Sequence, residues 1–125
     1  MDLKDLIPDD TPTVVELKHP STGEPLGMTV TIASRYSEVY EDYLYTKVQE
    51  RIDSGDAEDK KMSLKELQEE NRKMYANLTL DWTIKFDGKK PKLTSDKALE
   101  IYSKLKWIVP QIEEAIAAKE DFTSA

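Results

Sequence analysis

The chain has 125 residues and a mass of 14.3 kDa, which is the usual size of one compact domain. It contains 18 Lys and Arg against 25 Asp and Glu, so its formal charge is −7, an acidic balance that argues against binding to nucleic acid or to an anionic membrane surface. It has no cysteine, no apolar run of about 20 residues and no signal-peptide pattern, so we expect a cytoplasmic protein without disulfides, thiol chemistry or a membrane span.

The N-terminal part predicts a mobile arm followed by the start of a single α+β domain over residues 13–125. Residues 1–12 contain Pro8 and Pro12 in an acidic setting, which favours an extended arm. Residues 13–33 hold two runs of alternating apolar and polar residues around a Pro- and Gly-containing segment, as is typical of a β-hairpin. The residues predicted to face inward are Val15, Leu17, Met28, Val30 and Ile32. Because a lone hairpin is marginally stable in water, its apolar face must pack on helices.

Helices are expected over residues 35–122, with a flexible loop at 53–62. In the first helix, apolar residues recur three or four positions apart, a spacing that places them on one side for packing against the hairpin. They are Tyr36, Tyr40, Tyr43, Leu44, Val48 and Ile52. The second helix is predicted over residues 64–79, because Ser63 and Glu66 form a capping box at its start.

The second half of the chain predicts one short extended piece and two further helices. Residues 82–86 alternate before a turn at residues 87–88. Thr94 or Ser95 can cap a third helix, and Pro110 suits the first position of a fourth. The predicted fold class is therefore α+β and mostly α-helical, an N-terminal β-hairpin followed by about four helices packed in one small domain.

Side chains that usually carry catalysis or bind metals are sparse. His19 is the only histidine, so neither a Ser–His–acid triad nor a histidine-based zinc site has partners. The four glycines match no nucleotide-binding pattern, and the acidic loop from Asp53 has Glu58 and Leu64 where an EF-hand needs glycine and glutamate. We therefore predict a protein that is not an enzyme and has no cofactor and no bound metal.

A basic patch contrasts with the acidic whole. It lies next to Trp82 and Phe86 and consists of Lys85, Lys89, Lys90 and Lys92. Lysines beside aromatic rings are typical of a surface that stacks bases and binds phosphates, but the net charge favours an ordinary solubilising loop. Contact with an acidic surface of a neighbouring subunit is the remaining interpretation.

The order of these elements resembles that of one viral family. The stretch ELKHPSTGEPLGMTVTIASRYSEVYE is similar to the opening of tail assembly chaperones from siphophage-type bacteriophages, where a hairpin with an HP-x-TGEP-x-G turn precedes a Ser-rich helix start. The stretch LDWTIKFDGKKPKLTSDKALEIYSKLKWIVPQIEEAIAAKEDF resembles the second half of that family, with its Trp, D-G turn, T-x-x-x-A-L-x-x-Y pattern, Trp-containing corner and terminal helix. The likeness covers most of residues 13–122.

The resemblance implies a non-enzymatic chaperone. Such proteins coat the tape measure protein, a very long helical polypeptide that sets tail length, and keep it soluble while tube subunits assemble. The resemblance also implies a homo-oligomer of spiral or ring form, and a longer product of programmed ribosomal frameshifting that recruits the tail tube protein. The chain would be the short product, present in the host cytoplasm and absent from the mature virion, with neither nucleic acid nor membrane as a partner.

Amphipathicity, rather than the resemblance, indicates which residues contact the client or neighbouring subunits. The side chains of Trp107, Ile108 and Val109 cannot all face one core from one helix, so at least one is expected at an interface. The tyrosines of residues 36–45 favour the core at their helical spacing, with an interface as the alternative. The predicted contact set is Trp107, Ile108, Ile112, Ile116 and Phe122, followed by Tyr36 and Tyr40.

Two alternatives to the chaperone are left open by the sequence. A small acidic protein can mimic DNA and inhibit a host nucleic-acid-binding factor, which requires carboxylates concentrated on one elongated face. A carboxylate–metal enzyme requires a defined pair of acidic residues, and the sequence singles out no such pair.

Overall fold

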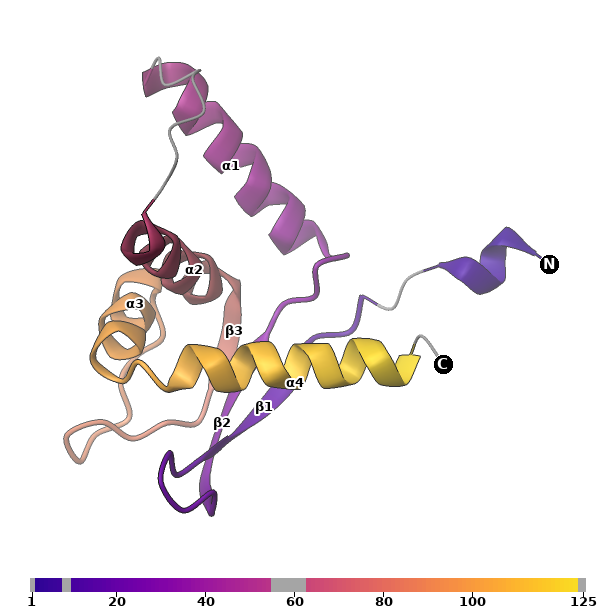
Figure 1. Ribbon diagram of the computed structural model, residues 1–125. Helices are drawn as coiled ribbons and strands as arrows, with labels where there is room; N and C mark the ends of the chain where they lie inside the picture. Colours follow the sequence, from indigo (N-terminus) through magenta and orange to yellow (C-terminus); the bar gives the residue numbers. More distant parts are fainter. Residues whose placement is uncertain (1, 8–9, 55–62, 124–125) are drawn as a thin grey trace.

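The computed structural model describes residues 2–7, 10–54 and 63–123, and it has the predicted α+β fold (Figure 1). A three-stranded antiparallel sheet, in the order β1-β2-β3, is combined with four α-helices. The elements in chain order are the 3-10 helix η1 (Leu3–Leu6), β1 (Thr13–Lys18), β2 (Pro25–Ile32), α1 (Glu38–Ser54), α2 (Leu64–Leu78), β3 (Thr79–Trp82), α3 (Ser95–Lys104) and α4 (Ile108–Thr123).

The predicted hairpin is confirmed as β1 and β2. Its turn is closed by the N–H of His19, which donates to Glu24 O at 2.8 Å, and by the N–H of Gly23, which donates to His19 O at 2.9 Å. Gly23 has φ +73°, a left-handed conformation that glycine adopts without steric cost. His19 Nδ1 accepts from the N–H groups of Ser21 and Thr22 at 3.1 and 3.3 Å. The only histidine is therefore a turn residue.

The third strand begins earlier than the alternation at residues 82–86 predicts. β3 leaves α2 directly at Thr79 and pairs with β2, placing Thr79 opposite Ile32 and Trp82 opposite Val30. Thr79 ends the helix because its Oγ1 donates to Tyr75 O at 2.7 Å while its backbone has already become extended. The position of β3 is therefore set by its pairing with β2, a strand far away in the sequence. The local alternation of apolar and polar residues carries no information about that pairing.

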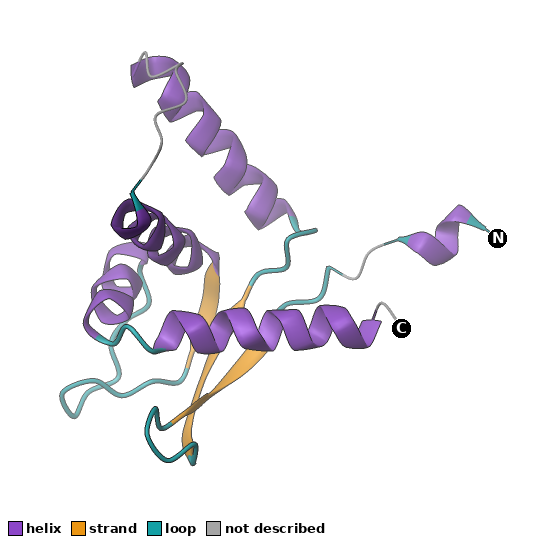
Figure 2. Ribbon diagram, in the orientation of Figure 1, coloured by secondary structure: helices purple, strands orange, loops and turns teal. Residues whose placement is uncertain are grey.

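One face of the sheet and three of the helices form the core. α4 lies against β1, and α3 packs on α2, whereas α1 extends away from the sheet (Figures 1 and 2). The largest fully buried side chains come from β1, β2, α3 and α4; they are Val15, Leu17, Val30, Ile32, Ile101, Tyr102, Ile108 and Ile112. Gln111 fixes α4 on the edge strand, because its side-chain amide accepts from Lys18 N–H at 2.9 Å and donates to Lys18 O at 2.8 Å.

The prediction that the apolar stripe of the first helix supports the hairpin is wrong. The main contact of α1 within the described residues is with α2, and the hairpin is covered instead by α4. The periodicity correctly indicated an apolar stripe on this helix, but the prediction that the stripe packs in the core is wrong. The core residues that cover the hairpin come from α4 and are Ile108, Val109 and Ile112. The stripe is consequently left at the surface over much of its length.

Local signals fare better at several boundaries. Ser63 Oγ accepts from Glu66 N–H at 3.2 Å at the start of α2, and Thr94 Oγ1 accepts from Lys97 N–H at 3.0 Å at the start of α3. The predicted turn is formed by Asp87 and Gly88, both with positive φ, as a tight two-residue turn requires.

Three further predictions differ from the structure or lie outside it. Residues 3–6 of the arm are a 3-10 turn rather than extended chain, because the Asp2 carboxylate accepts from Lys4 N–H at 3.0 Å. Pro110 is the third residue of α4 rather than the first, a place it tolerates because the first helical N–H groups have no intrahelical acceptor. Of the predicted loop at 53–62, residues 53–54 belong to α1, and residues 55–62 lie outside the described residues.

Candidate interaction surface

The structure separates the predicted contact set into buried, half-buried and exposed residues. Ile108 and Ile112 are only 1% and 0% exposed, because α4 turns them toward the core, so the structure places both in the core and not on the surface. Trp107, Ile116 and Tyr40 are half-buried and pack against the core. Tyr36 is exposed. The side chain of Phe122 lies outside the described residues.

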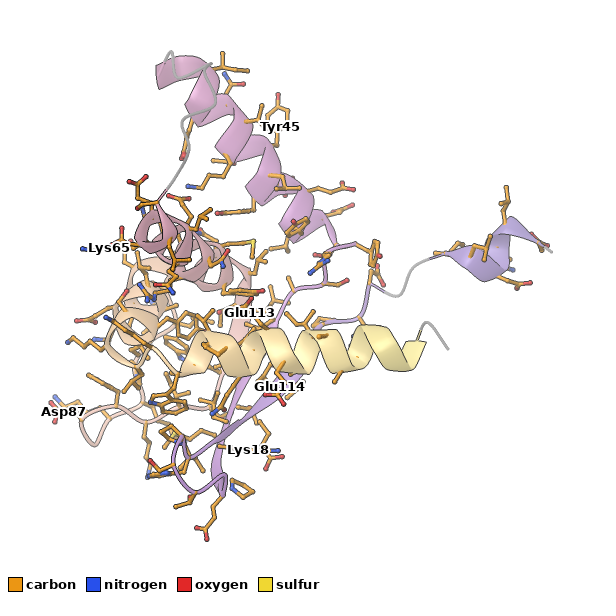
Figure 3. The ribbon with its side chains drawn as sticks, in the orientation of Figure 1. Lys18, Tyr45, Lys65, Asp87, Glu113 and Glu114 are labelled. Carbon is orange, nitrogen blue, oxygen red and sulfur yellow. The ribbon has the colours of Figure 1, made fainter. Side chains whose placement is uncertain are left out.

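The more extensive apolar surface is on α1. Four of its apolar side chains are exposed by 43, 73, 56 and 65%; in chain order they are Leu44, Tyr45, Val48 and Ile52, here called the α1 strip. Leu44, Val48 and Ile52 are spaced by four residues and form one row about 12 Å long. Tyr45 points away from the body of the molecule (Figure 3). The helical spacing in the sequence predicts an apolar stripe that contains three of these four residues. That no other helix covers them is visible only from the packing of the described residues.

A different side of α1 faces α2. Lys47 Nζ lies 3.3 Å from a Glu70 carboxylate oxygen and 5.9 Å from the centroid of the Tyr43 ring. Burial alone would lower the pKa of Lys47, but the hydrogen bond to Glu70 and the neighbouring charges raise it. Burial likewise opposes ionisation of Glu70, yet Lys47 and then Lys73 lower its pKa. At 100° per residue, Tyr43 and Lys47 lie about a third of a turn around the helix from the α1 strip, so these contacts leave the strip uncovered.

Acidic side chains border the α1 strip. Glu38, Glu41 and Asp42 are all exposed, and Glu41 lies one turn before Leu44 and Tyr45, at the N-terminal end of the strip. Lys47 is held by Glu70 on the other side and lies 3.8 Å from Glu50. The strip is therefore an apolar row with a negative border.

Other exposed apolar side chains do not form a comparable row on one helix. Two are at the start of α2, three are in the N-terminal arm, two are on strands, one lies just before α1 and one is in its first turn; they are Leu64, Leu67, Leu3, Leu6, Ile7, Val14, Leu80, Tyr36 and Val39. The arm residues provide a useful comparison, because they are as exposed as the strip but belong to a single short turn.

The basic patch is not arranged for stacking on bases. The Phe86 ring already has the Lys97 and Lys104 ammonium groups 5.8 and 5.5 Å from its centroid. Glu100 bridges those two lysines at 2.7 and 3.4 Å, and the two lysines lower its pKa. The indole N–H of Trp82 donates to Pro91 O at 3.0 Å. Both rings are engaged within the fold, which favours the interpretation of the patch as a solvated loop.

Side chains suited to metal binding are not gathered together in the part of the chain that is described. No cluster of three or more His, Asp or Glu side chains able to hold a metal ion occurs among these residues. None of the helices described is long and apolar enough to cross a membrane. Comparison with protein-family models, with curated proteins and with solved structures gives no match in any of the three.

Proposed function

We propose that this chain is a tail assembly chaperone of a siphophage-type bacteriophage, which binds the tape measure protein and keeps it soluble during tail assembly. The observation that carries the proposal is the α1 strip, a row of exposed apolar side chains on a helix that leans away from the core. A long amphipathic helical client aggregates through its own apolar stripes, and such stripes are covered by apolar surfaces presented by a partner. The sequence resemblance supplies the identity of that client.

The acidic exterior supports the same role. A chain with a formal charge of −7 gives a coated client a high negative charge, which keeps the complex soluble. The strip of one chain covers only about two turns of a helix, so a very long client requires many copies. Copies that associate with one another bind such a client with avidity well above the affinity of one strip.

The remaining parts of the proposal concern assembly. We propose that the chain forms a homo-oligomer, of spiral or ring form, on the tape measure protein in the host cytoplasm, and is absent from the mature virion. A longer frameshifted product would then bring the tail tube protein to the coated client. The protein has no catalytic role in this scheme.

The DNA-mimic alternative is less well supported. DNA mimicry needs carboxylates presented without neighbouring cations, whereas Glu100 is paired with Lys97 and Lys104, and Glu70 with Lys47 and Lys73. These pairs place positive charges among the negative ones on two separate surfaces. The pattern is that of a solvated, mixed-charge exterior.

The proposal is tested by co-expressing the chain with the tape measure protein encoded in the same genome. We expect the tape measure protein to be soluble, and to co-purify with the chain, only when the chain is present. A tape measure protein that stays insoluble, together with salt-sensitive binding of the chain to a basic host DNA-binding protein, would support the DNA mimic instead.

A further inference from the structure

We infer that the α1 strip takes a cationic amphipathic helix, that is, an apolar row bordered by Lys and Arg. This inference rests on the proposed function, because it specifies which segments of the client are bound. It is drawn from two properties of α1, the shape of its apolar row and the sign of the charge beside it.

The shape of the row fits another helix. Leu44, Val48 and Ile52 repeat every four residues, and such rows form the ridges that pack into the grooves of a facing helix. The row is about 12 Å long, so it matches two to three turns of the helix that lies on it. Tyr45, 73% exposed, lies beside the row and adds a wide, rigid contact.

The charge beside the row selects the kind of helix. Glu38, Glu41 and Asp42 are exposed on the first turns of α1. Lys47, the cation of α1 whose side chain the structure describes, is engaged with Glu70 and Glu50 and does not neutralise them. Lys or Arg on the flank of an incoming helix therefore meets a negative border, whereas Asp or Glu meets repulsion.

The same border argues against a second copy of α1 as the occupant. Two α1 helices packed strip to strip in parallel would bring both sets of acidic residues together, and like charges held close together are unfavourable. The shape of the α1 strip fits a helix, but its negative border does not attract the negative border of a second copy. A helix of different composition is the better match.

The test uses the full chain and three synthetic helical peptides with one apolar row and Lys, Gln or Glu flanks. Fluorescence anisotropy is measured at about 50 mM and about 500 mM salt. At low salt we expect the Lys-flanked peptide to bind at least about tenfold more tightly than the Glu-flanked one, and at high salt we expect that ratio to fall below about threefold.

Two charge variants locate the effect. Glu41→Gln with Asp42→Asn removes two adjacent carboxylates beside the strip, and Glu113→Gln with Glu114→Gln removes two adjacent exposed carboxylates on another helix, α4 (Figure 3). Both variants change the net charge equally. We expect only the first to reduce the preference for the Lys-flanked peptide, with circular dichroism confirming that both remain folded.

Equal binding of the three peptides, or an equal effect of the two variants, would overturn the inference. So would sedimentation showing that the strip is occupied by a second copy and is closed to every peptide. If the chain solubilises the tape measure protein without preferring cationic helices, the inference fails and the proposed function stands. If the chain prefers cationic helices but does not bind the tape measure protein, the proposed function is wrong. The inference that the α1 strip binds cationic amphipathic helices is then kept.

Discussion

Removing the apolar row of α1 should weaken client binding about a hundredfold while leaving the fold intact. The variant combines Leu44→Gln, Val48→Gln and Ile52→Gln. Glutamine forms helices at least as well as valine and isoleucine, and the three positions are exposed by 43, 56 and 65%. The free energy of unfolding should therefore change by less than about 1 kcal/mol.

The expected loss of binding follows from the area that a client would cover. Full burial of a Val, Leu or Ile side chain stabilises by about 1.5–3 kcal/mol. Roughly half of each side chain is in water, so covering the exposed part is worth about 1 kcal/mol per residue. Three residues together give about 3 kcal/mol, which corresponds to a loss of affinity of about a hundredfold.

The assay measures affinity for the tape measure protein, or for a helical fragment of it, by isothermal titration calorimetry, and stability by urea unfolding. The matched control is Leu3→Gln, Leu6→Gln and Ile7→Gln, which removes three apolar residues of the arm that are exposed by 81, 56 and 70%. We expect the control to bind as the wild type does. An α1 variant that binds with wild-type affinity, or a control that loses as much affinity, would refute the reasoning.

Three further predictions concern the fold and its charges. Ile112→Ala, at a position 0% exposed, should cost about 2–5 kcal/mol in urea unfolding, and a cost below about 1 kcal/mol would show that α4 is loosely packed. Burial raises the pKa of Tyr102 to about 12 against the effect of its hydrogen bond with Thr79, so stability should be full below pH 10 and fall by about 2–3 kcal/mol as the pH rises toward 12; Tyr102→Phe should flatten that part of the profile. Lys47 lowers the pKa of Glu70 against the effect of burial, so Glu70→Gln should cost up to about 1 kcal/mol at neutral pH, and the difference from wild type should vanish in acid as the pH falls through the lowered pKa.

Local sequence signals were sufficient for the hairpin, the starts of α2 and α3, and the two-residue turn. Alternation requires one buried and one exposed sheet face, and the structure buries Val15 and Leu17 while Glu16 stays exposed. Ser63 and Thr94 act within four residues of their partners, so their capping roles are readable from sequence alone.

The position of the apolar surface depends on which helix covers the sheet, and that is a tertiary property. Apolar residues recur at helical spacing in both α1 and α4. From the sequence alone, either helix could therefore have packed on the hairpin. The structure gives that place to α4, with Ile112 in the core and Gln111 bonded to the edge of β1. The sequence-based contact set therefore included Ile108 and Ile112, which are buried, and did not include Leu44 and Val48, which are exposed.

The most direct test of the account is hydrogen exchange of the chain alone and in complex with the tape measure protein. Backbone amides of an exposed helix that packs on a client exchange more slowly in the complex. We predict that the new protection is concentrated in residues 38–54. Protection confined to α4, or no protection anywhere in the presence of excess tape measure protein, would contradict the account.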